Sequence, residues 1–354
     1  MPVKQQSDIQ LMEIAEIPLL DPVFTKKEKY NTLQRFILQF IRDERDLPFV
    51  YLSLKITFFI IPIAVYLFLP DNFSWWIAIP YLVANMGIML GPYVLMLHNT
   101  SHRKLFKEEY TFLNHYIPWI LGPFYGESPE TYFYHHVGMH HAENNLSADI
   151  SSTMHYKRDN LKDFLIYFSQ FFLFGIIELS MYFKKKNRSR FLKKILLGEF
   201  SFILMCIILS FFNWQATLIV FVLPFIFSRF AMMAGNWAQH AFIDPSNPGN
   251  SYCNSITCIN TSYNKKCFND GYHIGHHLMP AMHWTDMPKN FQDNKEKYVK
   301  YNSIVFKEID YFTIWFFLMV HNYKLLASKF VVIDNSYKSQ EEIIALLKSR
   351  IQKF

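Results

Sequence analysis

The sequence predicts an all-α membrane protein with four transmembrane helices in two hairpins and a cytoplasmic helical cap that holds a histidine-rich di-metal site. Three observations lead to this prediction: apolar residues gather into long blocks, basic residues gather on one side of those blocks, and most of the 14 histidines cluster near the block ends. Only 18% of the 354 residues are charged and 51% are hydrophobic, which excludes a disordered chain. Four cysteines exclude a disulfide-dense scaffold.

The first two apolar blocks, residues 49–69 and 75–97, are each long enough to cross the hydrocarbon core of a bilayer, which takes about 20 apolar residues. Only a short turn separates them, so we expect a helical hairpin. Gly87 and Gly91 lie four residues apart on the second helix. This spacing allows another helix to approach closely, although glycine is also simply tolerated in membrane helices.

Residues 195–212 and 217–233 predict a second hairpin around the turn at 213–216. The turns within the two hairpins contain no Lys or Arg. The opposite ends of the spans adjoin a basic cluster at 184–194 and most basic residues of the N-terminal segment. The positive-inside rule therefore places both termini and all long segments in the cytoplasm. Because this bias accounts for the net charge of +6, we expect no nucleic-acid partner.

Three further apolar stretches, residues 110–125, 164–183 and 311–320, are shorter or interrupted by polar residues. We expect them to form helices in or near the membrane interface. The alternative for residues 164–183 is a fifth span.

We expect three parts along the chain: an N-terminal cytoplasmic segment (1–47), a membrane domain (48–330) and a C-terminal cytoplasmic tail (331–354). Residues 1–47 contain no apolar core with a cleavage site, so no cleaved signal peptide is expected.

The histidines form three motifs: H-x3-H at 98–102, H-x3-H-H at 136–141 and H-x2-H-H at 273–277. A fourth pair, Asn236 and His240, follows the last span. Because residues three or four apart share one face of a helix, each group can direct its side chains to one place. Neutral imidazole is the commonest metal ligand in proteins. The expected metal ligands are His98, His102, His136, His140, His141, His240, His273, His276 and His277.

Nine imidazoles exceed the ligands of one ion and suit two ions with open positions; imidazole favours iron, copper, zinc or nickel. The sequence contains no Glu-x-x-His or His-Glu-x-x-His motif, which speaks against a soluble di-iron bundle and a zinc peptidase. If His98 and His240 belong to one cluster, an even number of spans separates them. This parity argues against a span at residues 164–183.

The three histidine boxes on two helical hairpins resemble the membrane fatty acid desaturase superfamily, over about residues 50 to 290. The pair Asn236 and His240 is similar to the extra ligand pair of the acyl-CoA desaturases. Residues 269–277 are similar to the last box of the superfamily. The second box departs from many members, because three residues rather than two separate His136 from His140.

The resemblance implies oxygen-dependent desaturation of a lipid acyl chain, with two iron ions as cofactor, O2 as co-substrate and no catalytic residues beyond the metal ligands. It also implies that Asn236 acts through a water molecule. The sequence has no His-Pro-Gly-Gly segment, as found in fused cytochrome b5 domains, so we expect a separate electron donor of ferredoxin or cytochrome b5 type. The membrane would be a bacterial inner membrane or the endoplasmic reticulum. Lipid or carotenoid hydroxylases and ketolases share these boxes and remain the alternative.

Metal-bound histidines usually donate their second ring N–H to a carboxylate or carbonyl group. Residues near the boxes that could support the ligands in this way are Glu143, Asp149, Asp244, Asp270 and His283. We expect three isolated histidines, His115, His155 and His321, to be structural or surface residues. His136 fits the box spacing better than His135.

The cysteine spacing and the positions of charges in the spans bear on two alternatives to a catalytic site, a zinc site and a metal transporter. The spacing of Cys253, Cys258 and Cys267 does not favour zinc, and we expect reduced cytoplasmic thiols. A metal transporter would place ionisable residues at mid-membrane, whereas the charges in these spans lie near the span ends. The sequence therefore favours an enzyme.

Overall fold

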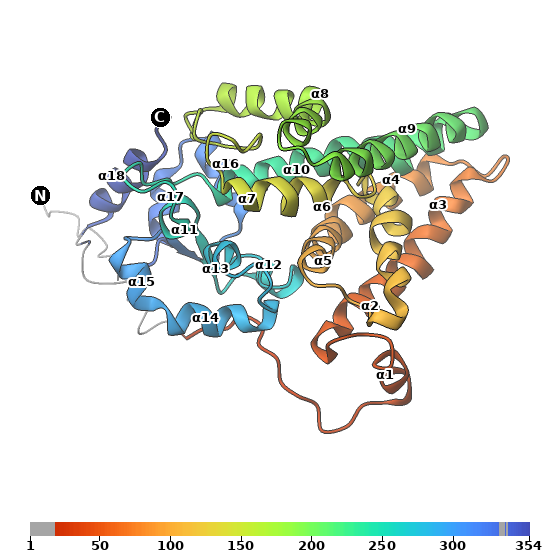
Figure 1. Cartoon of the computed structure of the whole chain (residues 1–354), viewed down its shortest axis with the longest axis horizontal. Coiled ribbons are helices and arrows are strands. Elements are labelled where there is room, and N and C mark those ends of the chain that lie inside the picture. Colours follow the sequence, from red (N-terminus) through yellow and green to blue (C-terminus); the bar gives the residue numbers. More distant parts are fainter. Residues whose placement is uncertain (1–17, 333–336, 338) are drawn as a thin grey trace, which may run out of the picture.

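The computed structural model describes residues 18–332, 337 and 339–354, and nearly all of its regular structure is helical (Figure 1). The α-helices are α1 (Thr32–Ile37), α2 (Leu47–Lys55), α3 (Ile61–Phe68), α4 (Trp75–Ala84), α5 (Leu90–His102), α6 (Thr131–His135), α7 (His141–Glu143), α8 (Leu161–Lys185), α9 (Ser189–Thr217), α10 (Leu223–Gln239), α11 (Ser251–Asn254), α12 (Ser262–Lys266), α13 (His273–Leu278), α14 (Met287–Asp293), α15 (Lys295–Lys300), α16 (Tyr311–Met319), α17 (Tyr323–Lys329) and α18 (Gln340–Arg350). Strands β1 (Thr257–Ile259) and β2 (Val305–Lys307) pair in parallel.

Short 3-10 and π-helical turns extend or connect these α-helices. The 3-10 turns are η2 (Glu44–Asp46), η5 (Glu108–His115), η7 (Gly122–Tyr125) and η10 (Trp284–Asp286). The π-helical turns are η3 (Ile56–Ile60), η4 (Asn85–Met89), η6 (Tyr116–Leu121), η8 (His136–His140) and η9 (Leu218–Val222).

The first hairpin consists of one apolar helical run over Glu44–Phe68 and a second over Trp75–His102. The first run stops at Leu69, which has an extended backbone (φ −65°, ψ 142°), because the residue before a proline disfavours the α conformation. Asp71 then adopts a positive φ of 61° in the turn. The hairpin predicted from the first two apolar blocks is confirmed.

The second hairpin consists of α9 and α10. Helical structure continues from Ser189 to Gln239 except at Asn213, where the backbone leaves the helical region (φ −157°, ψ 98°). The Asn213 side chain accepts a hydrogen bond from the Ala216 N–H (3.0 Å) and donates one to the Leu67 carbonyl of the first hairpin (3.2 Å). The chain therefore runs out along α9 and returns along α10 (Figure 1).

Helix α8 also has the length and composition of a membrane span, as do the three runs Glu44–Phe68, Trp75–His102 and Ser189–Gln239. However, both ends of α8 contact the same histidine-bearing segment. Near its start, the Tyr167 hydroxyl donates to the Ser151 carbonyl (3.2 Å); near its end, the Tyr182 hydroxyl donates to Glu143 (2.6 Å). Both ends of α8 therefore lie against one segment of the chain, and its position along the membrane interface stays a prediction.

Helix α18 at the C-terminus packs into the cap. Ile343, Leu347 and Ile351 are buried in the same hydrophobic core as Phe164 of α8 and Trp237 of α10. The tail expected after residue 331 therefore includes a helix that the cap holds, although the three-part division itself stays a prediction.

A fully buried arginine connects this C-terminal helix to the loop after the second histidine box. The Arg158 guanidinium donates to the carbonyls of Ala241 (2.8 Å), Arg350 (3.0 Å) and Gln352. A buried guanidinium is tolerated only when its N–H groups have acceptors, and these carbonyls supply them. The arrangement fixes the chain immediately after His240.

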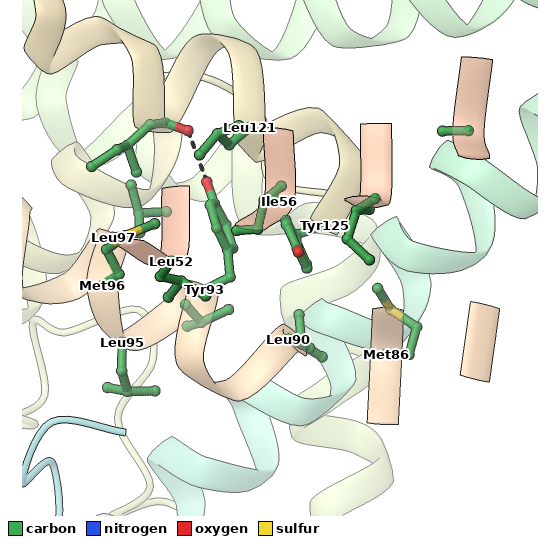
Figure 2. Close-up of a cluster of buried hydrophobic side chains, with 14 of the residues drawn as sticks. Leu52, Ile56, Met86, Leu90, Tyr93, Leu95, Met96, Leu97, Leu121 and Tyr125 are labelled. Carbon is green, nitrogen blue, oxygen red and sulfur yellow. Dashed lines mark hydrogen bonds between the residues drawn. The ribbon is translucent and has the colours of Figure 1, made fainter. Parts of the chain in front are cut away.

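A hydrophobic core holds the helix that carries the first histidine box (Figure 2). Tyr93 of α5 lies at its centre, with its ring stacked on Tyr125 at a centroid distance of 4.1 Å and an interplanar angle of 8°. The Tyr93 hydroxyl donates to the Ile117 carbonyl at 3.0 Å, so the buried tyrosine leaves no donor unpaired. The surrounding side chains include Leu52, Ile56, Met86, Leu90, Leu95, Met96, Leu97 and Leu121.

Two glycines permit close backbone approaches. Gly126 has a positive φ of 71°, and a Cβ atom there would collide with the backbone of Phe225. A Cβ atom at Gly198 in α9 would collide with the carbonyl oxygen of Pro129.

The close helix approach considered for Gly87 and Gly91 is not found. A Cβ atom at Gly87 would have nothing within 4 Å, and one at Gly91 would meet only the Cys267 side chain. Both glycines instead line a cavity.

Replacing Gly198 by Ala should lower the free energy of unfolding by about 1–3 kcal/mol, because the new methyl group forces α9 away from Pro129. Thermal unfolding in detergent should show a melting temperature several degrees lower than that of the wild type. Gly87→Ala is the matched control, because it also adds a methyl group to an apolar helix but meets open space. Equal melting temperatures for the two variants would contradict the close approach.

Candidate metal centre

The helices carry the histidine boxes to one place in the molecule. The first box ends α5, the third forms most of α13, and His240 directly follows α10. These elements meet α7 near the middle of the molecule (Figure 1). His98 and His240 therefore belong to one site, which is the premise of the parity argument.

The second box lies on a π-helical turn. Residues His136–His140 form η8, and α7 begins at His141. A π turn closes each hydrogen bond over one more residue than an α turn, and such turns are frequent at functional sites. The three residues between His136 and His140 are thereby accommodated while both side chains still face the site.

The nine expected ligands form two groups, and within each group the nearest ring nitrogens lie within 4.8 Å of one another. The first group contains five imidazoles: His98, His102, His136, His141 and His276. The second group contains four: His140, His240, His273 and His277.

The ring nitrogens in each group point at one another. The Nε2 atom of His276 lies 2.8 Å from that of His98 and 2.9 Å from that of His141. In the second group, the Nε2 atom of His273 lies 3.2 Å from that of His240 and 3.0 Å from that of His277. Two imidazole nitrogens bound at about 2.1 Å and at right angles to one ion are themselves about 3.0 Å apart. Each group therefore fits one ion.

The electrostatics of the site favour neutral rings. Burial lowers the pKa of His136, His273 and His276 well below its usual value, and the neighbouring imidazoles lower it further. Burial likewise lowers the pKa of His240 to about 3. Because a metal ligand must offer a free lone pair, neutral imidazoles at physiological pH are the form that an ion requires.

Two of the expected carboxylates contact the second ring nitrogen of a box histidine. Asp149 Oδ2 lies 2.7 Å from Nδ1 of His140, and Asp270 Oδ1 lies 3.2 Å from Nδ1 of His98. Burial opposes ionisation of Asp149, but contact with His140 and two hydrogen bonds from Ser151 outweigh it and lower its pKa to about 2. Carboxyl groups in these positions fix the ring orientation and leave Nε2 for the ion.

The other expected supporting residues have different partners. Glu143 contacts Tyr182 (2.6 Å) and Lys186 (2.8 Å), which secure the end of α8. Asp244 pairs with Arg350 (3.0 Å). Their short separation from a box in sequence therefore does not bring them into contact with a box histidine.

His283 lies outside the two groups, and the role of Asn236 as a ligand through water stays a prediction. His283 Nε2 contacts Asp46 (2.9 Å) within a small cluster at the start of the first span. The Asn236 amide donates to the Ser151 carbonyl (3.0 Å) and the Tyr167 hydroxyl (2.7 Å), which leaves its Oδ1 as the remaining polar atom.

Sequence reasoning missed two contacts of the site. Nδ1 of His240 lies 2.9 Å from the Asn254 carbonyl, a main-chain acceptor that no side-chain pattern reveals. The Tyr132 ring stacks on His136 at a centroid distance of 5.4 Å. Tyr132 lies four residues before His136 on the same helical segment, so its helical spacing was a usable signal.

A cavity of about 1290 Å³ opens onto the two groups. Its lining includes His98, His136, His140 and His273, and its remaining walls are mostly apolar side chains from both hairpins. The volume exceeds that of an ordinary ligand pocket and suits a long apolar molecule.

A comparison with known protein families matches residues 73–308 to the family described as fatty acid desaturase. The chain belongs to the fatty acid desaturase family. The same kind of comparison with curated proteins gave no match, and neither did one with solved structures. This desaturase is therefore an O2-dependent oxidoreductase and a multi-pass membrane protein that acts on lipids.

Asp149→Asn should weaken metal binding by the desaturase about tenfold or more, because the amide removes the negative charge that holds His140. Glu143→Gln is the matched control: it makes the same change two residues after His141, at a side chain that contacts Tyr182 and Lys186. Metal content after purification and titration with a competing chelator measure both. Equal metal affinity in the two variants would contradict the supporting role of Asp149.

Proposed function

We propose that the protein desaturates a lipid acyl chain with O2 at a di-iron centre, with electrons from a separate donor protein of ferredoxin or cytochrome b5 type. The observation that carries the proposal is the separation of nine buried or half-buried imidazoles into groups of five and four beside a large, mostly apolar cavity. In this proposal each group holds one iron ion, and Asn236 contributes through a water molecule.

Iron is favoured by the donor set together with the family. An all-nitrogen imidazole set suits several transition metals, and oxygen chemistry on an unactivated alkyl chain requires a redox-active one. When bound, the iron ions supply the oxygen and redox chemistry. The chain's own residues hold the ions, orient the substrate and exclude bulk water.

The cavity supplies the positioning. Leu52, Leu90, Val94 and Met233 belong to its apolar lining, and the histidines occupy one part of its wall. An acyl chain in this cavity is held with one segment beside the candidate metal centre. Such orientation supplies a large part of the rate of a bimolecular reaction.

The proposed site lies on the cytoplasmic side, with both termini in the cytoplasm. The basic cluster Lys184, Lys185 and Lys186 ends α8, on the same side as the segment between the second histidine box and that helix. An electron donor from the cytoplasm would approach this side.

His240→Ala and His277→Ala should each remove iron and abolish desaturation, because each deletes an imidazole from the group of four. His321→Ala should retain both, since the His321 side chain is 62% exposed and contacts Asp159 rather than a box. The measurements are iron content and mass spectrometry of lipids from an expression host with simple lipids. A product that gains an oxygen atom instead of losing two hydrogens would favour the hydroxylase or ketolase alternative.

The proposed orientation predicts which engineered cysteines an impermeant maleimide labels in intact cells. Ser74→Cys, in the turn of the first hairpin, should be labelled from outside. Lys185→Cys, at the end of α8, should be labelled only after permeabilisation, with the wild-type protein as the background. The reverse pattern would contradict the proposed cytoplasmic site.

A further inference from the structure

One side of the cavity carries buried polar atoms without a partner among the described residues. They are Oε1 of Glu127, Oγ1 of Thr131, Nε2 of His135 and Oγ of Ser228, and all four residues line the cavity. Each unpaired buried polar atom costs about 1–3 kcal/mol, so such atoms normally face ordered water. Four of them in one cavity indicate a hydrated strip along its wall.

The strip leads toward the candidate metal centre. Thr131 and His135 lie one turn apart on α6, and His136 follows directly. On α10, Ser228 and Asn236 lie two turns apart, and His240 follows one turn later. Glu127 lies at the far end of both rows and is only 4% exposed.

The charges around Glu127 leave it as the available acid. Arg229 forms an ion pair with Glu199 (3.1 Å) and donates to the Gly126 carbonyl (2.9 Å) and the Ser128 hydroxyl (3.1 Å). Because Arg229 is already paired with Glu199, its positive charge stabilises the Glu127 carboxylate less than an unpaired arginine would.

The other acids in the cavity wall have partners. Asp270 contacts His98, Tyr263 and Gln239, and Asp310 caps α16 through Thr313. Glu127, by contrast, has a buried carboxyl oxygen without a hydrogen-bond partner among the described residues.

We propose that Glu127 supplies protons to the candidate metal centre through water held along this strip. The proposal rests on the proposed desaturase function. Conversion of CH2–CH2 to CH=CH releases two protons and two electrons from the substrate, and the donor protein supplies two further electrons. Reduction of O2 to two water molecules takes four protons and four electrons. The substrate supplies only two of the protons, so two more must enter the cavity. The Glu127 O–H bond breaks, its proton passes to a water oxygen, and the carboxylate is reprotonated from solvent.

The protonation equilibrium of Glu127 suits this role. Burial raises its pKa to about 7; the nearby Arg229 and the Ser228 hydroxyl beside it lower the pKa, and Glu199 raises it. Tyr93 and Tyr132 are the other titratable groups that face it, and burial raises the pKa of Tyr132 well above its usual value. At neutral pH Glu127 is thus present both as the acid and as the carboxylate, which is the condition for efficient proton transfer.

The test compares Glu127→Gln, Glu127→Asp and Glu178→Gln in iron-loaded enzyme in membranes of a host that supplies electrons. Glu178 lies on α8, where it accepts a hydrogen bond from Gln170, and does not line this cavity. Glu127→Gln should lower turnover about a hundredfold with unchanged iron content and KM, and should release more peroxide per product. Glu127→Asp should restore part of the turnover, and Glu178→Gln should match the wild type.

A second variant tests the same idea without changing Glu127. Turnover should fall as pH rises through the pKa of Glu127, because the protonated form is the donor. Glu199→Gln leaves the charge of Arg229 free to stabilise the Glu127 carboxylate, so the pKa of Glu127 falls. The falling limb of the pH profile should then move to lower pH.

Two results would overturn the proposal. One is a Glu127→Gln enzyme with the wild-type pH profile and peroxide ratio. The other is a variant in which only KM rises, which would assign the strip to substrate binding. Iron-loaded wild-type enzyme that makes no double bond would refute the proposed function and this inference together, whereas a desaturating wild type with an unaltered variant refutes this inference alone.

Discussion

The structure depends on bringing nine imidazoles, from four separate parts of the chain, into two groups less than 5 Å across. Such crowding is costly, because every ring is desolvated and each must remain uncharged. Hydrogen-bond partners on the second ring nitrogens offset part of this cost: Asp149 contacts His140, and the Asn254 carbonyl contacts His240. The two hairpins follow from the same requirement, since both must return the chain to one side.

Departures from regular helix shape this arrangement. Each span of the first hairpin and the start of α10 contain a π-helical turn, as does the second histidine box. A π turn rotates the following residues relative to those before it, so one helix can pack one face on a neighbour and then present another. In the second span, η4 carries Gly87 to the cavity wall while α5 delivers His98 to the site.

Features that depend on neighbouring residues in the sequence could be predicted, whereas contacts between distant residues could not. The boxes and hairpins were predictable because apolar length and i, i+4 spacing are local. The supporting carboxylates were not distinguishable: Asp270 lies beside the third box but contacts His98 of the first, whereas Glu143 lies beside the second box and contacts α8. The Asn254 carbonyl and the π turns have no side-chain signature, so only the folded chain reveals them.

The charge of the site explains why its acids are held at a distance. Nine neutral rings do not neutralise bound cations, and the nearest carboxylates, Asp149 and Asp270, act through the imidazoles rather than on an ion. An acid that must repeatedly release protons cannot sit among these residues, because a cationic centre would hold it ionised. Glu127 meets this requirement in the proposal, because it is balanced between Arg229 and Glu199 and no box histidine is among the groups that shift its pKa. The proposed reaction therefore needs both apolar cavity walls, which hold the acyl chain, and a hydrated strip, which conducts protons.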